Sequence, residues 1–172
     1  MKPKFQQLYM GLAQRIAQMS VANRLQVGAV VVKDDIVIIG YNGTPAGWDN
    51  TCEDRVYMDA DAGGWLDPET IALQWPFIEY IGEEDTEARR YTLVTKPEVL
   101  HAERNALDKL AKSTESGKGA VMFVTHAPCL ECAKSIYGTG IKEVFYGIQY
   151  RNLNGVEFLE KCGIAVTQLK VA

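Results

Sequence analysis

Residues 120–132 read Ala-Val-Met-Phe-Val-Thr-His-Ala-Pro-Cys-Leu-Glu-Cys, and this stretch decides the type of fold. Its first six residues are mostly apolar and β-branched, which is typical of a strand that is buried on both faces. Pro128 interrupts the run, and a helix is expected to begin near Cys129 and to stop around Gly138 to Gly140. A buried strand followed directly by a helix predicts an α/β protein.

The segments on either side of this stretch continue the alternation of helix and strand. The pair Asn154 and Glu157 has the spacing of a capping box, which predicts the start of a short helix. Such alternation implies right-handed parallel crossovers. The expected elements are a helix over 102–112, a strand over 144–148, a helix from 154 to about 162, and a last strand over 164–167.

The first quarter of the chain predicts one helix and one β-hairpin. Strands are expected over 27–32 and 36–41, with a tight turn at 33–35. Both strands are apolar on both faces, so we expect both faces of the sheet to be covered. An apolar stripe at helical spacing precedes the hairpin and is interpreted as core packing; its members are Phe5, Leu8, Leu12, Ile16 and Met19.

Residues 43–98 are the least regular part and form an insertion in what we expect to be a single domain over 1–172. Asp67-Pro68-Glu69 is a good helix start, and Pro76 is expected to end or kink that helix. The acidic residues at 83–85 are interpreted as a solvated loop. Because long structureless loops are uncommon in compact domains, we expect the insertion to pack as a lid or as a subunit contact.

Composition excludes several classes of protein. The chain has 172 residues and a formal net charge of −4, and it has no basic run, which argues against a polynucleotide partner. No apolar run approaches the ~18 residues that a membrane span needs, and the N-terminus lacks the apolar core of a secretory signal. Four cysteines do not make a disulfide framework. We therefore expect a reducing, cytoplasmic protein.

Three residues have the types and spacing of a catalytic zinc site. One imidazole (His101) and two thiolates (Cys129 and Cys132) would leave a fourth position open. A zinc ion held in this way lowers the pKa of its bound water from ~16 to about 7 and so makes a nucleophile at neutral pH. Cys-x-x-Cys alone is equally typical of a structural zinc knuckle or a redox pair. A structural site needs four protein ligands, however, and Cys52 and Cys162 are single and distant.

Glu103 supplies the remaining group that this chemistry needs. Residues two apart do not face each other within a helix, so His101 and Glu103 can reach one pocket only if they straddle a helix start. Glu103 would then take a proton from the bound water and pass it to the substrate. The pattern His-x-Glu followed by Pro-Cys-x-x-Cys is the signature of zinc nucleobase deaminases.

Three motifs together resemble the deoxycytidylate (dCMP) deaminase family, a branch of the cytidine deaminase superfamily. They are Gly40-Tyr41-Asn42-Gly43-Thr44-Pro45, His101-Ala102-Glu103-x-Asn105-Ala106 and Pro128-Cys129-x-x-Cys132-Ala133-Lys134. The resemblance implies a three-layer α/β fold, in which a five-stranded mixed sheet carries helices on both faces. It also implies a homo-oligomer, often a hexamer, that makes dUMP for dTTP synthesis. The implied effectors are dCTP as activator and dTTP as inhibitor, with Mg²⁺ accompanying the triphosphate.

The resemblance also implies roles for individual residues. His101, Cys129 and Cys132 would bind Zn²⁺, and Glu103 would shuttle protons. Simpler interpretations stay open: Asn42-Gly43 as a plain turn, Arg24 as a solvated charge, Tyr150 as packing. His126 is interpreted as a satisfied polar residue near the pocket. The implied substrate contacts are Asn42, Ala102 through its backbone, Thr125 and Tyr150, and the implied effector contacts are Arg24, Gln26, Asn42 and Gly43.

The chain departs from the family in its insertion. Some members hold a second, structural zinc there, but this chain has only two histidines, both outside the insertion, so we expect one zinc. The different insertion leaves open dCTP, or another cytosine nucleoside or nucleotide, as a substrate. A different class of function, an inactive zinc-stabilised nucleotide-binding scaffold, also stays open. The presence of Glu103 argues against it, because a scaffold has no need of a proton shuttle.

Overall fold

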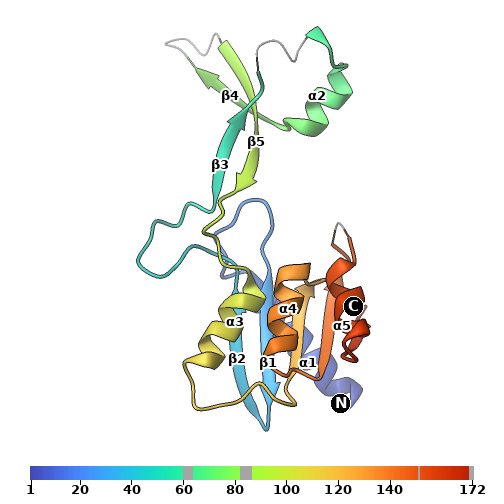
Figure 1. Ribbon diagram of the computed structural model, residues 1–172. Helices are drawn as coiled ribbons and strands as arrows, with labels where there is room; N and C mark the ends of the chain where they lie inside the picture. Colours follow the sequence, from blue (N-terminus) through green and yellow to red (C-terminus); the bar gives the residue numbers. More distant parts are fainter. Residues whose placement is uncertain (60–63, 82–86, 151, 171–172) are drawn as a thin grey trace.

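A computed structural model describes residues 1–59, 64–81, 87–150 and 152–170 of the chain. Its main feature is a five-stranded mixed sheet (Figure 1). The strand of residues 28–33 pairs antiparallel with both of its neighbours, and the three strands from the second half of the chain run parallel to one another. In spatial order the strands are β2 (Ile36–Tyr41), β1 (Gly28–Lys33), β6 (Val121–His126), β7 (Glu143–Ile148) and β8 (Ala165–Gln168).

Helices cover both faces of this sheet. One face packs against α1 (Pro3–Ala17), where Met10 and Ala13 meet Phe123 and Phe145 in one buried cluster. The larger core lies on the opposite face, under α3 (Ala102–Ala111), α4 (Leu130–Gly138) and α5 (Asn154–Lys161). The predicted three-layer α/β architecture is confirmed, and the strands predicted in the sheet lie within one residue of their observed bounds.

The predicted core stripe of α1 is wrong for Phe5, Leu8 and Met19, which are exposed, whereas Leu12 packs against the buried cluster as predicted. Leu8 is 59% exposed and Met19 is 61% exposed, and the buried residues of the helix are Met10, Ala13 and Ala17. The reason is close packing: a Cβ on Gly28 of β1 would lie 2.0 Å from the carbonyl oxygen of Ala13. Small residues therefore form the contact between α1 and β1. A pattern of large apolar residues in the sequence cannot reveal a buried helix face made of small ones.

The expectation that both faces of β2 are covered is also wrong for the described chain. Ile36, Val37 and Ile39 are all exposed, because β2 is an edge strand. The helix of residues 154–161 forms as predicted, but Asn154 does not cap it. Leu153 occupies the N-cap position without a side-chain hydrogen bond.

The insertion is more regular than the sequence suggests. It contains β3 (Glu53–Tyr57), α2 (Pro68–Gln74), β4 (Phe77–Ile81) and β5 (Glu87–Thr95). The strands form an antiparallel sheet in the order β3-β5-β4, which projects away from the main sheet (Figure 1). We call this projecting part, residues 53–95, the extension.

The helix of the extension begins as predicted. The Asp67 side chain accepts hydrogen bonds from the backbone amides of Glu69 and Thr70, and the helix ends before Pro76. The predicted acidic loop at 83–85 lies outside the described residues. Among the helices of the described ranges, none has both the length and the apolar character that crossing a membrane requires.

Candidate active site

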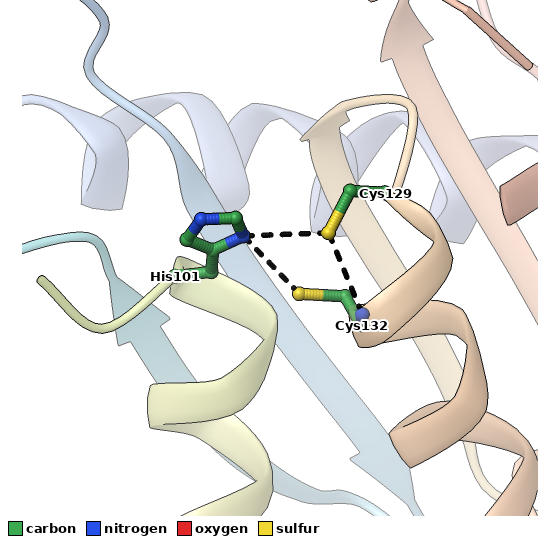
Figure 2. A group of neighbouring side chains, drawn as sticks. All are labelled: His101, Cys129 and Cys132. Atoms are coloured by element: carbon green, nitrogen blue, oxygen red, sulfur yellow. Dashed lines mark hydrogen bonds between the residues drawn. The ribbon is translucent and has the colours of Figure 1, made fainter. Parts of the chain in front are cut away.

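Two helix starts meet at the proposed metal ligands. His101 is the N-cap residue of α3 and Cys129 is the N-cap residue of α4, while Cys132 lies in the first turn of α4. Figure 2 shows the imidazole facing both sulfur atoms. His101 Nδ1 lies 3.5 Å from the Cys129 Sγ and 3.3 Å from the Cys132 Sγ. His101 lies far from the two cysteines in the sequence, and the fold brings the three ligand atoms within 4.8 Å of one another.

These distances fit a tetrahedral zinc ion. With Zn–S bonds of ~2.3 Å and Zn–N bonds of about 2.0–2.1 Å, sulfur and nitrogen ligands lie about 3.5 Å apart. In the described part of the chain, this is the one group of three His, Cys, Asp or Glu side chains placed to hold a metal ion. Three protein ligands leave one position for a reacting molecule, as in catalytic zinc sites.

The pKa values of the two thiols shift in opposite directions. Hydrogen bonds from Cys132 and His101 lower the pKa of Cys129 to about 3. The same contact with Cys129, together with burial, raises the pKa of Cys132. The hydrogen bond with Cys129 also raises the pKa of His101. Before a metal binds, Cys129 is therefore a thiolate and Cys132 keeps its proton.

Glu103 lies in the first turn of α3, so it straddles the helix start with His101, as expected from the sequence. Its side chain is buried, with a relative exposure of 5%, and burial raises its pKa. A carboxyl group with a raised pKa can both accept and release a proton near neutral pH. Such a group beside a zinc site is suited to general acid and base catalysis.

A pocket with about 620 Å³ of empty space, part of it open to solvent, is lined by Glu103 and by two of the three proposed ligands, His101 and Cys129. The pocket is partly apolar, and among its described lining residues none is a lysine or an arginine. Its walls are formed by Leu25, Val27, Asn42, Glu53, Thr95, Val99, His101, Ala102, Glu103, His126, Ala127, Cys129 and Tyr150.

Residues 3–148 match a family model described as the cytidine and deoxycytidylate deaminase zinc-binding region. The chain belongs to this deaminase family. It is 34% identical to the deoxycytidylate deaminase of Enterobacteria phage T4 over 170 residues, which cover 90% of this chain and 84% of the phage protein. It is 36% identical to the human deoxycytidylate deaminase over 141 residues, covering 80% of this chain and 61% of the human one.

A solved structure supports the same assignment. The dCMP deaminase of the cyanophage S-TIM5, crystallised in complex with dCMP and dUMP, superposes with a TM-score of 0.72 at 34% identity. The match covers 98% of this chain and 99% of the cyanophage chain. The fold is therefore that of the cytidine deaminases, and the protein is a hydrolytic deaminase enzyme with a zinc-binding region.

Asn42 and Gly43 connect the hairpin of the deaminase to the start of α3. The Asn42 side chain donates to the Leu25 carbonyl and accepts from the Val27 amide, at 2.8 Å each. Gly43 exchanges backbone hydrogen bonds with Leu100, the residue before His101. Asn42 lines the pocket, so its contact with the substrate sugar stays a prediction that this placement permits.

Of the other predicted contact residues, Ala102 and Tyr150 line the pocket, whereas Arg24, Gln26, Gly43 and Thr125 do not. The Arg24 guanidinium donates to Thr95 Oγ1 at the extension, and the Gln26 side chain donates to the Ser20 carbonyl. Thr125 is buried, and it touches the pocket only through its neighbour His126. The effector role of Arg24 and Gln26 and the substrate contact of Thr125 stay predictions.

Sequence reasoning missed Glu53 as a pocket residue. Its carboxylate is 6% exposed and accepts hydrogen bonds from the backbone amides of Asn23 and Arg24, at 3.1 and 3.2 Å. It joins the root of the extension to the segment before β1. An acid next to a lone cysteine in an irregular region gives no signal from which this contact could be predicted.

Proposed function

We propose that this deaminase converts dCMP and water to dUMP and ammonia. The observation that carries the proposal is the placement of a buried carboxyl group, Glu103, in one pocket with His101 and Cys129 of a three-ligand metal site. Support for dCMP as the substrate comes from the similarity to named deoxycytidylate deaminases over most of the chain.

His101, Cys129 and Cys132 would hold the metal, and a bound zinc ion supplies a water activated for attack. Glu103 then does the proton chemistry. It takes a proton from the attacking water and donates it to N3 of the cytosine ring. It then takes the second proton, from the hydroxyl group added at C4, and passes it to the departing amine, which leaves as ammonia. Burial raises the pKa of Glu103, so its carboxylate is a stronger base than that of an exposed glutamate and is better suited to take up the proton that it later returns.

The pocket walls suggest how the nucleotide is held. Ala102 is the first residue of α3, so its backbone amide is not used by the helix and can contact the cytosine ring. Asn42 and Tyr150 lie on the walls and would contact the sugar and stack near the base. Peptide and amide donors of this kind orient a neutral base without adding charge to the site.

Regulation and assembly are part of the proposal. We place dCTP, with Mg²⁺, and dTTP near Arg24, Gln26, Asn42 and Gly43, and we assign the product to dTTP synthesis in the cytoplasm. Homo-oligomer formation, with a hexamer as the expected size, is supported by large exposed apolar side chains on and beside the extension. Trp65 is 89% exposed and Leu73 is 83% exposed, and such groups are typical of protein contacts.

The test is ammonia release from dCMP and from dCTP in parallel, with Mg²⁺ and with or without dTTP. We expect turnover of dCMP that dTTP inhibits. Turnover of dCTP as well would mean that the pocket admits a triphosphate. The control is Glu103→Gln, which should lose activity by roughly 10³-fold or more while it retains zinc.

One outcome favours the alternative from a different class. Tight nucleotide binding without ammonia release from any cytosine nucleotide would indicate a zinc-stabilised scaffold, and the catalytic proposal would be wrong. Equal activity of wild type and Glu103→Gln would overturn the assigned role of Glu103.

A further inference from the structure

His126 lines two neighbouring pockets of the molecule. It is the last residue of β6, and its ring lines the deaminase pocket. The same residue lines a second, solvent-open cleft between α1 and the segment after β8, together with Gln14, Gln26 and Lys170. His126 therefore stands where a molecule bound at the metal site would extend toward solvent.

A chain of hydrogen bonds determines which nitrogen of His126 carries the proton. The Gly28 amide donates to Thr125 Oγ1 at 3.2 Å, and Thr125 Oγ1 lies 3.0 Å from His126 Nδ1. Thr125 is 6% exposed, so its own hydroxyl hydrogen needs a partner. His126 Nδ1 is the acceptor within reach. Because Nδ1 accepts, the proton of the neutral ring lies on Nε2.

Burial supports the neutral ring, because it lowers the pKa of His126. The ring is also held from the side: it meets the Tyr150 ring edge-on, with centroids 6.5 Å apart and planes at 85°. His126 thus presents a fixed N–H donor, and this donor requires no change of protonation near neutral pH.

The side-chain amide of Asn42, which also lines the pocket, is already engaged: it donates to the Leu25 carbonyl and accepts from the Val27 amide. None of the described lining residues carries a fixed positive charge. A nucleotide in this pocket nevertheless brings a phosphate, which must be recognised by donors at the solvent side.

We propose that the Nε2–H of His126 donates a hydrogen bond to the 5′-phosphate of the substrate, and that Thr125 is the positioning residue that holds His126 in this tautomer. The proposal rests on the proposed function. His126 lines both the pocket that holds His101 and Glu103 and the second, solvent-open cleft, so a nucleotide whose base lies at the metal ligands and Glu103 can place its phosphate beside His126. His126 is then a specificity residue that distinguishes a nucleotide from a nucleoside.

The first test compares dCMP with deoxycytidine in the zinc-loaded enzyme. His126→Phe keeps an aromatic ring against Tyr150 but removes the donor, and His126→Gln keeps a donor. We expect His126→Phe to lower kcat/KM for dCMP about 10- to 100-fold more than for deoxycytidine, since a hydrogen bond to a charged group is lost. His126→Gln should recover part of this preference. Equal losses for both substrates, or no loss, would overturn the proposal.

The second test reads the tautomer directly. The chain has two histidines, so a ¹⁵N-histidine spectrum contains two rings, one of which is the metal ligand His101. We expect the His126 ring to carry its proton on Nε2, and dUMP but not deoxyuridine to shift that resonance. Thr125→Val should populate the other tautomer and reduce the preference for dCMP, whereas Thr125→Ser should preserve both.

The two proposals fail in different ways. Absence of dCMP turnover in the wild-type enzyme contradicts the proposed function, whereas the tautomer spectrum does not depend on turnover. A wild-type ring that carries its proton on Nδ1, or a Thr125→Val spectrum identical to that of the wild type, contradicts the role assigned to His126 and Thr125.

Discussion

At the residue scale, the three proposed metal ligands share protons through hydrogen bonds when no metal is bound. Cys129 is held as a thiolate by Cys132 and His101, and Cys132 keeps its proton because it donates a hydrogen bond to Cys129 and is buried. Zinc needs both sulfurs as thiolates and the imidazole neutral. Metal binding must therefore displace the proton of Cys132, and below the raised pKa of His101 it must displace a second one.

We predict that the apparent zinc affinity of the metal-free enzyme rises with pH. Each displaced proton contributes about a tenfold change per pH unit, so the slope is steeper below the raised pKa of His101, where the imidazole must also lose a proton, than above it. Competition with a chelator, corrected for the chelator's own protonation, measures the slope. Cys162→Ser is the control and should leave it unchanged. A pH-independent affinity would contradict the proton assignment.

The sequence predicts the residues of the metal site better than those of the pocket walls. His101, Cys129, Cys132 and Glu103 could be selected because the chemistry restricts residue type, order and spacing. Glu53 could not, because its role depends on a contact with a backbone segment far away in sequence. The orientation of His126 likewise depends on hydrogen bonds that only the folded chain forms.

At the element scale, the site depends on how closely helices can approach the loops that carry the ligands. Gly155, in the first turn of α5, lies against the backbone before α4. A Cβ at this position would be 2.1 Å from the Pro128 carbonyl oxygen and 2.8 Å from the Cys129 carbonyl atoms. Glycine is therefore required here so that α5 can support the loop that positions Cys129.

We predict that Gly155→Ala destabilises the enzyme by about 1–3 kcal/mol and lowers its zinc content. The added methyl group must push Pro128 and Cys129 away, and both are backbone contacts that cannot rotate aside. Thermal unfolding and metal analysis are the measurements. The control is Gly138→Ala in α4, where an added Cβ meets no atom within 4 Å. Similar behaviour of the two variants would show that this contact does not determine the ligand position.

Elements of the main sheet were predictable because each is a short apolar run bounded by turns. The strands of the extension were not, since β3 pairs with β5 across more than thirty intervening positions and both carry charged residues. Their regularity comes from this long-range pairing rather than from local composition. The same limitation explains the error in α1, whose buried face is formed by small residues.

At the scale of the whole molecule, Trp65 and Leu73 of the extension are not buried by any residue in the described part of the chain. If a second copy of the chain covers them, as the proposed oligomer requires, replacing them should weaken assembly. We predict that the double variant Trp65→Ser, Leu73→Ser has a lower particle mass in light scattering at equal concentration. Glu69→Gln, an exposed change on the same helix α2, is the control. An unchanged mass would place the subunit contact elsewhere.

The pairing at the root of the extension has a consequence for how this family can diversify. Glu53 faces Thr95 and Tyr57 faces Tyr91, so the strands leave and re-enter the enzyme side by side. Adjacent antiparallel strands need only a short turn to connect them. Everything beyond the tyrosine pair is thus an exchangeable module, which evolution or a protein engineer can shorten, lengthen or replace. The first residue pair of these two strands, Glu53 and Thr95, lines the pocket. Such exchanges can therefore alter assembly while the residues of the pocket are kept.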